Sequence, residues 1–366
     1  MTDRLRARSR RNALNAALVP VLAVASGLLV ASIFILFTPT PPLEAYGIMF
    51  TAGFGCEEIG RCALLTTLER STPLILTGLS AVVAFRAGLF SIGQEGKFVV
   101  GATLAAWLGY TVDLPPVLHQ LMIIAAAMAG GAAYGFIPAI LKVKLAVNEI
   151  ISTIILNSLA VLFMTYLVNF PLRADAGSTA RSPLINESAV LPSFLPGSQW
   201  GVGWVLAVTA VVGVTFLLWR TVIGYEQRMA GQAPAFARFG GVLTARAAIR
   251  AMLISGSLAG LAGGIEVLGV SKQIVPGFSS GLGFDGVLVA ILGLAHPVGV
   301  LLVAILFAGI RLGAQLGLQV AADIPRELGG GILALIIVFV AAQGAFVGLI
   351  DRVRGMFGRR ARDADA

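Results

Sequence analysis

Polar side chains that interrupt long apolar runs are the groups in this sequence best suited to binding another molecule. They fall in four places: SIGQEG at 91–96, NEIISTIILN at 148–157, one glutamate in the run 247–270, and the stretch 284–315. Amides and carboxylates are costly in apolar surroundings, and they commonly mark the path of a polar ligand. We expect that path to include Phe90, Gln94, Glu95, Asn148, Ser152, Asn157, Glu266, Phe284 and Gln315.

The same residues also have structural explanations. Glu95 could pair with Lys97, and Asn157 could bond the backbone of a neighbouring helix. Glu149 could likewise pair with Lys142 or Lys144, and the phenylalanines could fill packing gaps instead of stacking on a ligand. Glu266 and Gln315 are the better ligand candidates, because they lie farther from the charged flanks of their segments.

The residues that catalysis or metal binding would need are scattered. The two histidines, His119 and His296, lie far apart, and no Cys-His, Ser-His-Asp or His-Glu-x-x-His pattern occurs. The stretch 281–286 fits G-x-G-x-x-G but follows no strand, and SIGQEGK lacks the first glycine and last hydroxyl of a phosphate loop. We therefore expect no enzyme, no metal and no nucleotide site in this chain.

Composition indicates the elements that must hold these groups. The 366 residues are 57% hydrophobic and 12% charged, against about 25% charged in a soluble domain. Apolar runs long enough to cross a bilayer recur, which predicts an all-α integral membrane protein of about ten transmembrane helices. We place the spans at 17–38, 68–86, 93–112, 117–141, 146–170, 200–219, 247–270, 283–296, 298–318 and 328–349. The eighth is too short to cross fully and could be broken or re-entrant.

Charge predicts the orientation of this membrane domain, 17–350. With the N-terminus inside, the cytoplasmic side receives 19 of the 26 lysines and arginines, as the positive-inside rule requires. The basic N-terminus 1–16 and the tail 351–366 are then both cytoplasmic. Spans 2–5 and 7–10 start in opposite directions, which favours an inverted repeat.

Two segments are expected outside the cell. The segment 46–69 would lie on or dip into the outer surface; its Cys56 and Cys62 could form a disulfide or remain free thiols. The loop 171–199 holds four prolines and is the longest polar excursion on this side, where a substrate-delivering protein could dock.

A polar segment between two apolar runs, GYEQRMAGQAPAFARFGG at 224–241, is longer than a turn needs. We interpret it, within the cytoplasmic loop 220–246, as a short helix offered to a soluble partner; a solvated loop is the alternative. Charged groups would contact the partner at the rim and aromatics at the centre. The residues expected to make or shape this contact are Gly224, Tyr225, Glu226, Arg228, Met229, Gly231, Pro234, Phe236, Arg238 and Gly241.

This segment closely resembles the coupling loop of permease subunits in bacterial ABC importers of the nucleoside and simple-sugar type. Three further runs resemble the same family: AFRAGLFSIGQEGKFVVGA, VNEIISTIILN and GFDGVLVAILGLAHPVGVLLVAILFAG. The first two resemble the nucleoside branch. The resemblance implies a cell-membrane permease that imports nucleosides, with a second permease (a paralogue), an ATPase that binds ATP and Mg, and an extracellular substrate-binding lipoprotein.

Two other functions stay open at this stage. The same machine could carry ribose, xylose or another simple sugar. A secondary transporter that works without ATP is the other possibility, although no paired acidic residues are arranged in the sequence for ion coupling.

Overall fold

The computed structural model describes residues 26–36, 40–56, 62–174, 180–195 and 198–321, with 330, 331, 334, 335 and 338 beyond them. These residues form helices, turns and two isolated β-bridges. The chain divides into two compact units, one of residues 56–308 and one of residues 1–55 with 309–366. The predicted cytoplasmic termini, half of the first predicted span and most of the last lie outside the described residues.

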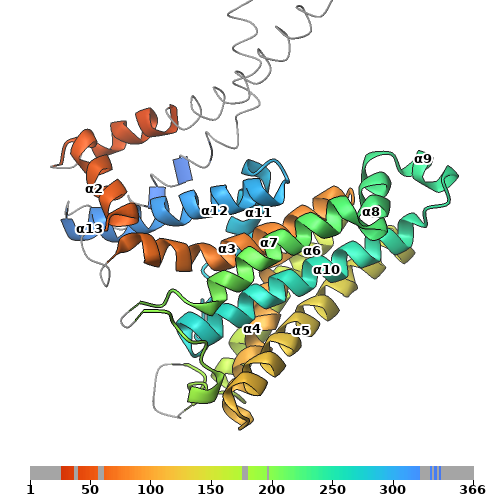
Figure 1. The fold of residues 1–366 in the computed structure, drawn as a ribbon, viewed down its shortest axis with the longest axis horizontal. Helices are drawn as coiled ribbons and strands as arrows, with labels where there is room; N and C mark the ends of the chain where they lie inside the picture. The colour runs from red at the N-terminus through yellow and green to blue at the C-terminus, as the bar shows by residue number, and fades with distance from the viewer. Residues whose placement is uncertain are drawn as a thin grey trace, which may run out of the picture. The chain divides into compact units, whose positions relative to one another are not determined.

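The larger unit is a bundle of long helices (Figure 1). In chain order they are α3 (Ala63–Arg86), α4 (Gln94–Thr111), α5 (Pro116–Leu145), α6 (Glu149–Asn169), α7 (Val202–Arg220), α10 (Thr244–Ile265), α11 (Leu282–Leu292) and α12 (Pro297–Leu312). Helix α12 continues past the boundary between the units. Two short helices, α8 (Val222–Gln232) and α9 (Pro234–Phe239), project from one end of the bundle (Figure 1).

Small residues let α10 lie at the centre of the bundle. A Cβ atom on Gly256 would meet the carbonyl of Gly131 on α5, and one on Gly263 would meet the carbonyl of Phe98 on α4. Helices that approach this closely gain dispersion contacts, which matter most in lipid because lipid tails are as apolar as the side chains. Almost every residue of α10 after Ser255 is buried as a result.

The outer helices keep apolar side chains on their exposed faces. On α6, Ile155, Leu159, Leu162 and Phe163 are exposed at helical spacing. Such a face would be unstable in water, so lipid or another apolar surface must cover it. Five helices of the described residues are long and apolar enough to cross a membrane: Pro116–Leu145, Glu149–Asn169, Val202–Arg220, Thr244–Ser271 and Pro297–Gly317.

The described residues of the loop predicted outside, within 171–199, lie at the end of the bundle opposite α8 and α9 (Figure 1). Its described part contains the 3₁₀ turn η1 (Glu187–Ala189). The backbone N–H of Asn186 donates to the carbonyl of Gly109 near the end of α4. The backbone N–H of Leu191 donates to the carbonyl of Leu268, which follows α10. Buried His119 of α5 bonds Ser188 through Nδ1 at 2.8 Å.

The smaller unit packs the helix Ser26–Ile35 and α2 (Pro42–Phe54) with the π-helical turn η3 (Gly313–Gly317) and α13 (Leu318–Ala321). Its core joins Ile35, Met49 and Leu318. The Tyr46 hydroxyl donates to the carbonyl of Leu28 at 2.6 Å.

Several predicted boundaries change in the structure. Helix α3 starts at residue 63, not 68, so Glu69 lies within it rather than in a surface segment. Cys56 and Cys62 form a disulfide just before it. The eighth predicted span is indeed short: α11 covers residues 282–292, and a tight turn with positive φ at Leu294 and Ala295 leads into α12.

Candidate functional site

The predicted partner-binding segment forms two helices where one was predicted. The Thr221 side chain caps α8 by accepting from the N–H of Gly224 at 3.1 Å. Pro234 then occupies the first turn of α9, where its missing N–H costs nothing, and Ala233 separates the two helices. Gly241, with φ of 80°, turns the chain toward α10. We call residues 222–239 the α8–α9 segment.

Two glycines attach α8 to the bundle by its backbone. A Cβ on Gly224 would meet the carbonyl of Leu217 on α7. A Cβ on Gly231 would lie 2.5 Å from the carbonyl oxygen of Arg86 and 2.6 Å from the amide nitrogen of Gly88, in the turn between α3 and α4. No side chain larger than hydrogen fits at either place without moving main chain. Helix α8 is therefore joined directly to α7 and to the α3–α4 turn.

An aromatic junction reinforces this attachment. The guanidinium carbon of Arg86 lies 5.5 Å from the ring centre of Trp219, and that of Arg228 lies 5.9 Å from it. The His296 ring centre is 4.9 Å from that of Trp219, and Arg86 donates through Nε to the Ala295 carbonyl at 2.8 Å. Cation–π contacts at such distances contribute about 0.5–2 kcal/mol each. The junction connects α8 to α7, α3 and the α11–α12 turn.

The charged residues of the segment have partners within the chain. Glu226 accepts from Arg250 of α10 at 2.9 Å, so α8 is also tied to α10. The Arg238 side chain lies 3.4 Å from the Thr244 hydroxyl. Sequence alone placed Glu226, Arg228 and Arg238 at the rim of a partner contact and gave no sign of these internal contacts.

The outward face of the segment is apolar. Phe236 is 64% exposed and Phe239 is 93% exposed, with Ala237 buried beneath them. Tyr225, Val222 and Ile223 are also exposed, whereas Met229 is half-buried. Phe239 was not among the predicted residues, although its spacing from Phe236 places both on one side of a helix with buried Ala237 on the other.

Two of the predicted ligand residues, Asn157 and Glu95, form hydrogen bonds with backbone groups of neighbouring segments. Asn157 of α6 accepts from the N–H of Gly96 at 2.8 Å and donates to the carbonyl of Ile92 at 2.7 Å. Glu95 accepts from the N–H of Gly283 at the start of α11, at 2.7 Å. The backbone alternative for Asn157 is confirmed, and the pairing of Glu95 with Lys97 is wrong. Gln94 is fully buried, and neither of its amide atoms has a partner among the described residues.

Lys97, one of the 19 basic residues counted above toward the cytoplasmic side, lies inside the bundle. It is 1% exposed, and its Nζ donates to the Ser255 hydroxyl at 2.9 Å. Ser255 in turn bonds Ser80 of α3 at 2.9 Å. The sequence could not show this, because Ser255 and Ser80 belong to helices far away along the chain.

At the start of α6, the exposed Asn148 caps the helix by accepting from the N–H of Ile150 at 2.9 Å. Ser152, one turn later, is buried. The predicted pair of Glu149 with Lys142 is confirmed, with Nζ and Oε2 2.7 Å apart.

The other predicted ligand residues belong to further elements of the chain. Phe90 stacks on Phe85, with ring centres 4.9 Å apart, and Phe284 is partly exposed on α11. Phe278 stacks on Phe98. Gln315 is half-buried in η3 of the smaller unit.

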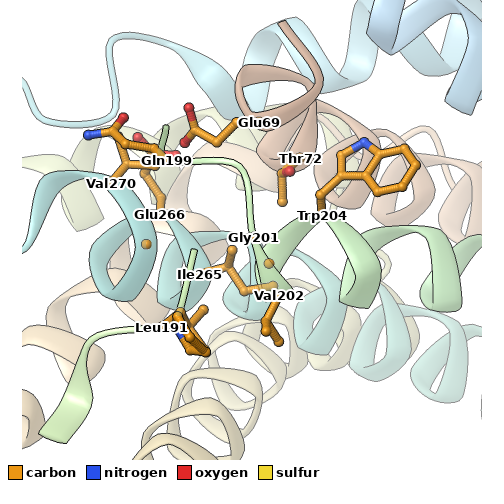
Figure 2. A pocket seen from close by; sticks show the side chains of 13 residues that line it. Glu69, Thr72, Leu191, Gln199, Gly201, Val202, Trp204, Ile265, Glu266 and Val270 are labelled. Carbon is orange, nitrogen blue, oxygen red and sulfur yellow. The ribbon is translucent and has the colours of Figure 1, made fainter. Parts of the chain in front are cut away.

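Glu266 lines a pocket at the end of the bundle that carries the 171–199 loop (Figure 2). It opens the π-helical turn η2 (Glu266–Ser271), which continues α10. Glu69 of α3 lines the same pocket and was not predicted, because its neighbour Glu266 is remote in sequence. Within the described ranges, no three His, Cys, Asp or Glu side chains come together in a way that could hold a metal ion.

Comparison with known proteins places this architecture in a family. A profile described as "Branched-chain amino acid transport system / permease component" matches residues 63–341. The guanosine ABC transporter permease protein NupP of Bacillus subtilis is 36% identical over 90% of this chain and 94% of its own length. No solved structure matches the chain significantly.

Two other relatives are similar over nearly as much of the chain. The glucose ABC transporter permease protein TsgB13 of Haloferax volcanii is 33% identical over 95% of this chain and 92% of its own. The nucleoside ABC transporter permease protein NupB of Lactococcus lactis is 32% identical over 89% and 91%. The chain is therefore an integral membrane protein that belongs to the family of ABC transporter permease components.

Proposed function

We propose that this chain forms one half of the pore of an ABC importer that carries nucleosides into the cytoplasm, and that its α8–α9 segment receives the ATPase. The observation that carries the proposal is the exposed apolar face of that segment, attached through glycine backbone to helices α7, α3 and α4. A face of this kind outside the bundle needs a protein partner, and its rigid attachment would pass the partner's movement to the bundle.

Charge supports the cytoplasmic location of this end. Lys142 and Lys144 end α5 here, and the basic residues of α7, α8, α9 and α10 lie in or beside the α8–α9 segment. Cytoplasmic loops carry an excess of lysine and arginine, so we place the α8–α9 segment inside and the 171–199 loop outside. A complete crossing by about ten spans and cytoplasmic termini are parts of the same proposal.

The proposal also includes the partners that such a chain requires. A second permease, a paralogue of this one, would complete the pore, and an extracellular binding lipoprotein would deliver the nucleoside to the 171–199 side. ATP and Mg would be bound by the ATPase. The predicted ligand residues remain candidates for the path, with Gln94 and Glu266 better supported than Asn157, whose amide atoms are already paired with backbone.

Co-purification tests the ATPase contact. The double variant Glu226→Lys, Arg238→Glu inverts two charges on the segment and should lose the ATPase and uptake of labelled guanosine together. Retention of both would contradict the assignment of the α8–α9 segment. Reaction of a cysteine placed at Arg228 with an impermeant reagent outside intact cells would contradict the orientation.

A sugar is the second candidate cargo, because one relative with similar coverage carries a glucose permease name. Competition decides between the two. Excess unlabelled guanosine or uridine should abolish uptake of labelled guanosine, whereas excess ribose or glucose should leave it unchanged. Inhibition by the free sugars at similar concentration would favour the sugar permease.

A further inference from the structure

The pocket beside Glu266 is formed by four separate parts of the larger unit (Figure 2). Helix α3 contributes Glu69 and Thr72, and the end of α10 with η2 contributes Ile265, Glu266, Gly269 and Val270. The start of α7 and, from the outer loop, Leu191, Pro192, Gln199 and Gly201 close the other sides. The empty space between its walls is about 340 Å³ when the open solvent at its mouth is counted, so the pocket is a shallow recess that can take the edge of a small molecule.

Two carboxylates at the pocket are buried. Glu69 is 5% exposed and Glu266 is 8% exposed. Neither side-chain oxygen of Glu69 accepts a hydrogen bond from the described residues, and its ion pair with the Nε of Arg70 is 3.9 Å long. A buried carboxylate without donors is expensive, so this arrangement is suited to an occupant that supplies them.

The π-helical turn contributes to the geometry of this site. One extra residue per turn in η2 interrupts the regular side-chain spacing of α10 just where Glu266 meets the pocket. Such turns cost stability and occur often at functional sites. The Ser271 hydroxyl donates to the Glu266 carbonyl at 3.1 Å, which satisfies one backbone group that the altered spacing leaves.

The lining chemistry defines the class of ligand. Ionised carboxylates only accept hydrogen bonds, and paired hydroxyls on neighbouring carbons are matching donors, as in the recognition of ribose by an acidic residue. Leu191, Val202 and Ile265 provide an apolar side. No lysine or arginine is among the described residues that line the pocket. A phosphate group would therefore meet two acidic side chains in the lining, while Arg70, which pairs with Glu69, does not line the pocket.

We propose that this pocket is an outer subsite of the transport path, in which Glu69 and Glu266 bind the 2′- and 3′-hydroxyls of an unphosphorylated ribonucleoside. The proposal rests on the function proposed above and adds the site and its selectivity. Nucleosides that lack these hydroxyls lose the donors, and nucleoside monophosphates are repelled. The outer loop lies over the site, so a ligand released at that loop reaches these carboxylates first.

The test uses the complete transporter in proteoliposomes, with the second permease, the ATPase and the binding protein. The apparent KM is measured for guanosine and for 2′,3′-dideoxyguanosine with wild type, Glu69→Gln and Glu266→Gln. Hydrogen bonds to a charged group contribute about tenfold or more in affinity, so each variant should raise the KM for guanosine about tenfold and barely change that for the dideoxy compound. The preference of the binding protein cancels, because it is the same in every comparison.

Glu187→Gln is the matched control, because this exposed glutamate lies in the same outer loop and does not line the pocket. It should leave both KM values unchanged, and ATPase activity in all variants should report correct assembly. An unchanged ratio of the two KM values in both pocket variants would overturn the proposal. Absence of nucleoside uptake by the wild type would instead contradict the proposed function itself.

Discussion

Charged and apolar side chains are arranged in opposite ways at the two ends of the larger unit. At the α8–α9 end, charged side chains are paired within the chain and aromatic side chains are exposed. At the outer end, Glu69 and Glu266 are buried beside an open pocket while the surrounding loop is bonded to the helix ends. The first arrangement suits a stable contact with a protein, and the second suits a small polar molecule that comes and goes. The two ends are therefore suited to different partners.

The largest effect is expected from a substitution that disturbs the contact between Gly231 of α8 and the α3–α4 turn. Gly231→Val should reduce the ratio of nucleoside uptake to ATP hydrolysis by tenfold or more, because its Cβ would collide with the main chain of Arg86 and Gly88. Overpacking against atoms that cannot rotate away costs about 1–3 kcal/mol or more. Parallel measurements of both rates in proteoliposomes check it.

The control for this change is Gly213→Val on α7, where an added Cβ would meet nothing within 4 Å. That variant should couple normally. Normal coupling in Gly231→Val would mean that α8 is not joined to the α3–α4 turn during transport.

At the outer end, replacement of Glu69 should increase stability, whereas the change at Gly231 should reduce it. Glu69→Gln removes a buried charge that has no hydrogen-bond donor, so the free energy of unfolding should rise by about 1–3 kcal/mol. Thermal unfolding of the detergent-purified protein measures this as a higher midpoint. A lower midpoint would show that the charge has a stabilising partner and would weaken the contrast between the ends.

An exposed aromatic on the α8–α9 segment should affect only partner binding. Phe239→Ser should weaken association with the ATPase by about 1–2 kcal/mol, about five- to thirtyfold, and leave thermal stability unchanged, because 93% of the side chain is exposed. Binding of purified ATPase to the permease in nanodiscs provides the measurement. Phe194→Ser, in the outer loop, should bind the ATPase like wild type; equal weakening in both would contradict the assigned face.

The smallest effect is expected from the ion pair at the same end. A double-mutant cycle with Glu226→Gln and Arg250→Gln should give a coupling energy of about 0.2–1 kcal/mol in thermal stability, since both side chains are partly exposed. A coupling energy above about 2 kcal/mol would show that this pair, and not glycine packing, is the main attachment of α8 to the bundle.

Sequence patterns predicted the helices better than the contacts between them. The bounds of α4, α6 and α7 fall within a few residues of the predicted spans, because long apolar runs with polar ends define their own limits. Helix α3 begins at residue 63, within the segment 46–69 that the sequence predicts at the outer surface. Only folding shows that Glu69 is buried beside Glu266.

The candidate sites were predicted to different degrees for the same physical reason. The α8–α9 segment is continuous in sequence, so one stretch contains its glycines, its proline and its aromatics, and their role in binding a partner stays a prediction. The outer pocket draws residues from four segments, and only Glu266 was predicted there. Lys97 was misplaced because its partner, Ser255, comes from another helix. Sites assembled over long sequence separations leave little trace in local patterns.

Where two segments of main chain are in direct contact, no side chain lies between them that could change its rotamer and absorb a movement. The contact of Gly231 with the α3–α4 turn is of this kind, so a tilt of α8 must displace that turn by a similar amount. The exposed residues proposed to face the ATPase can consequently be exchanged without changing this contact. The exposed residues of 222–239 could be replaced by those of a related permease, with Gly224 and Gly231 retained. This chain should then bind the ATPase of that permease, while its substrate preference stays the same.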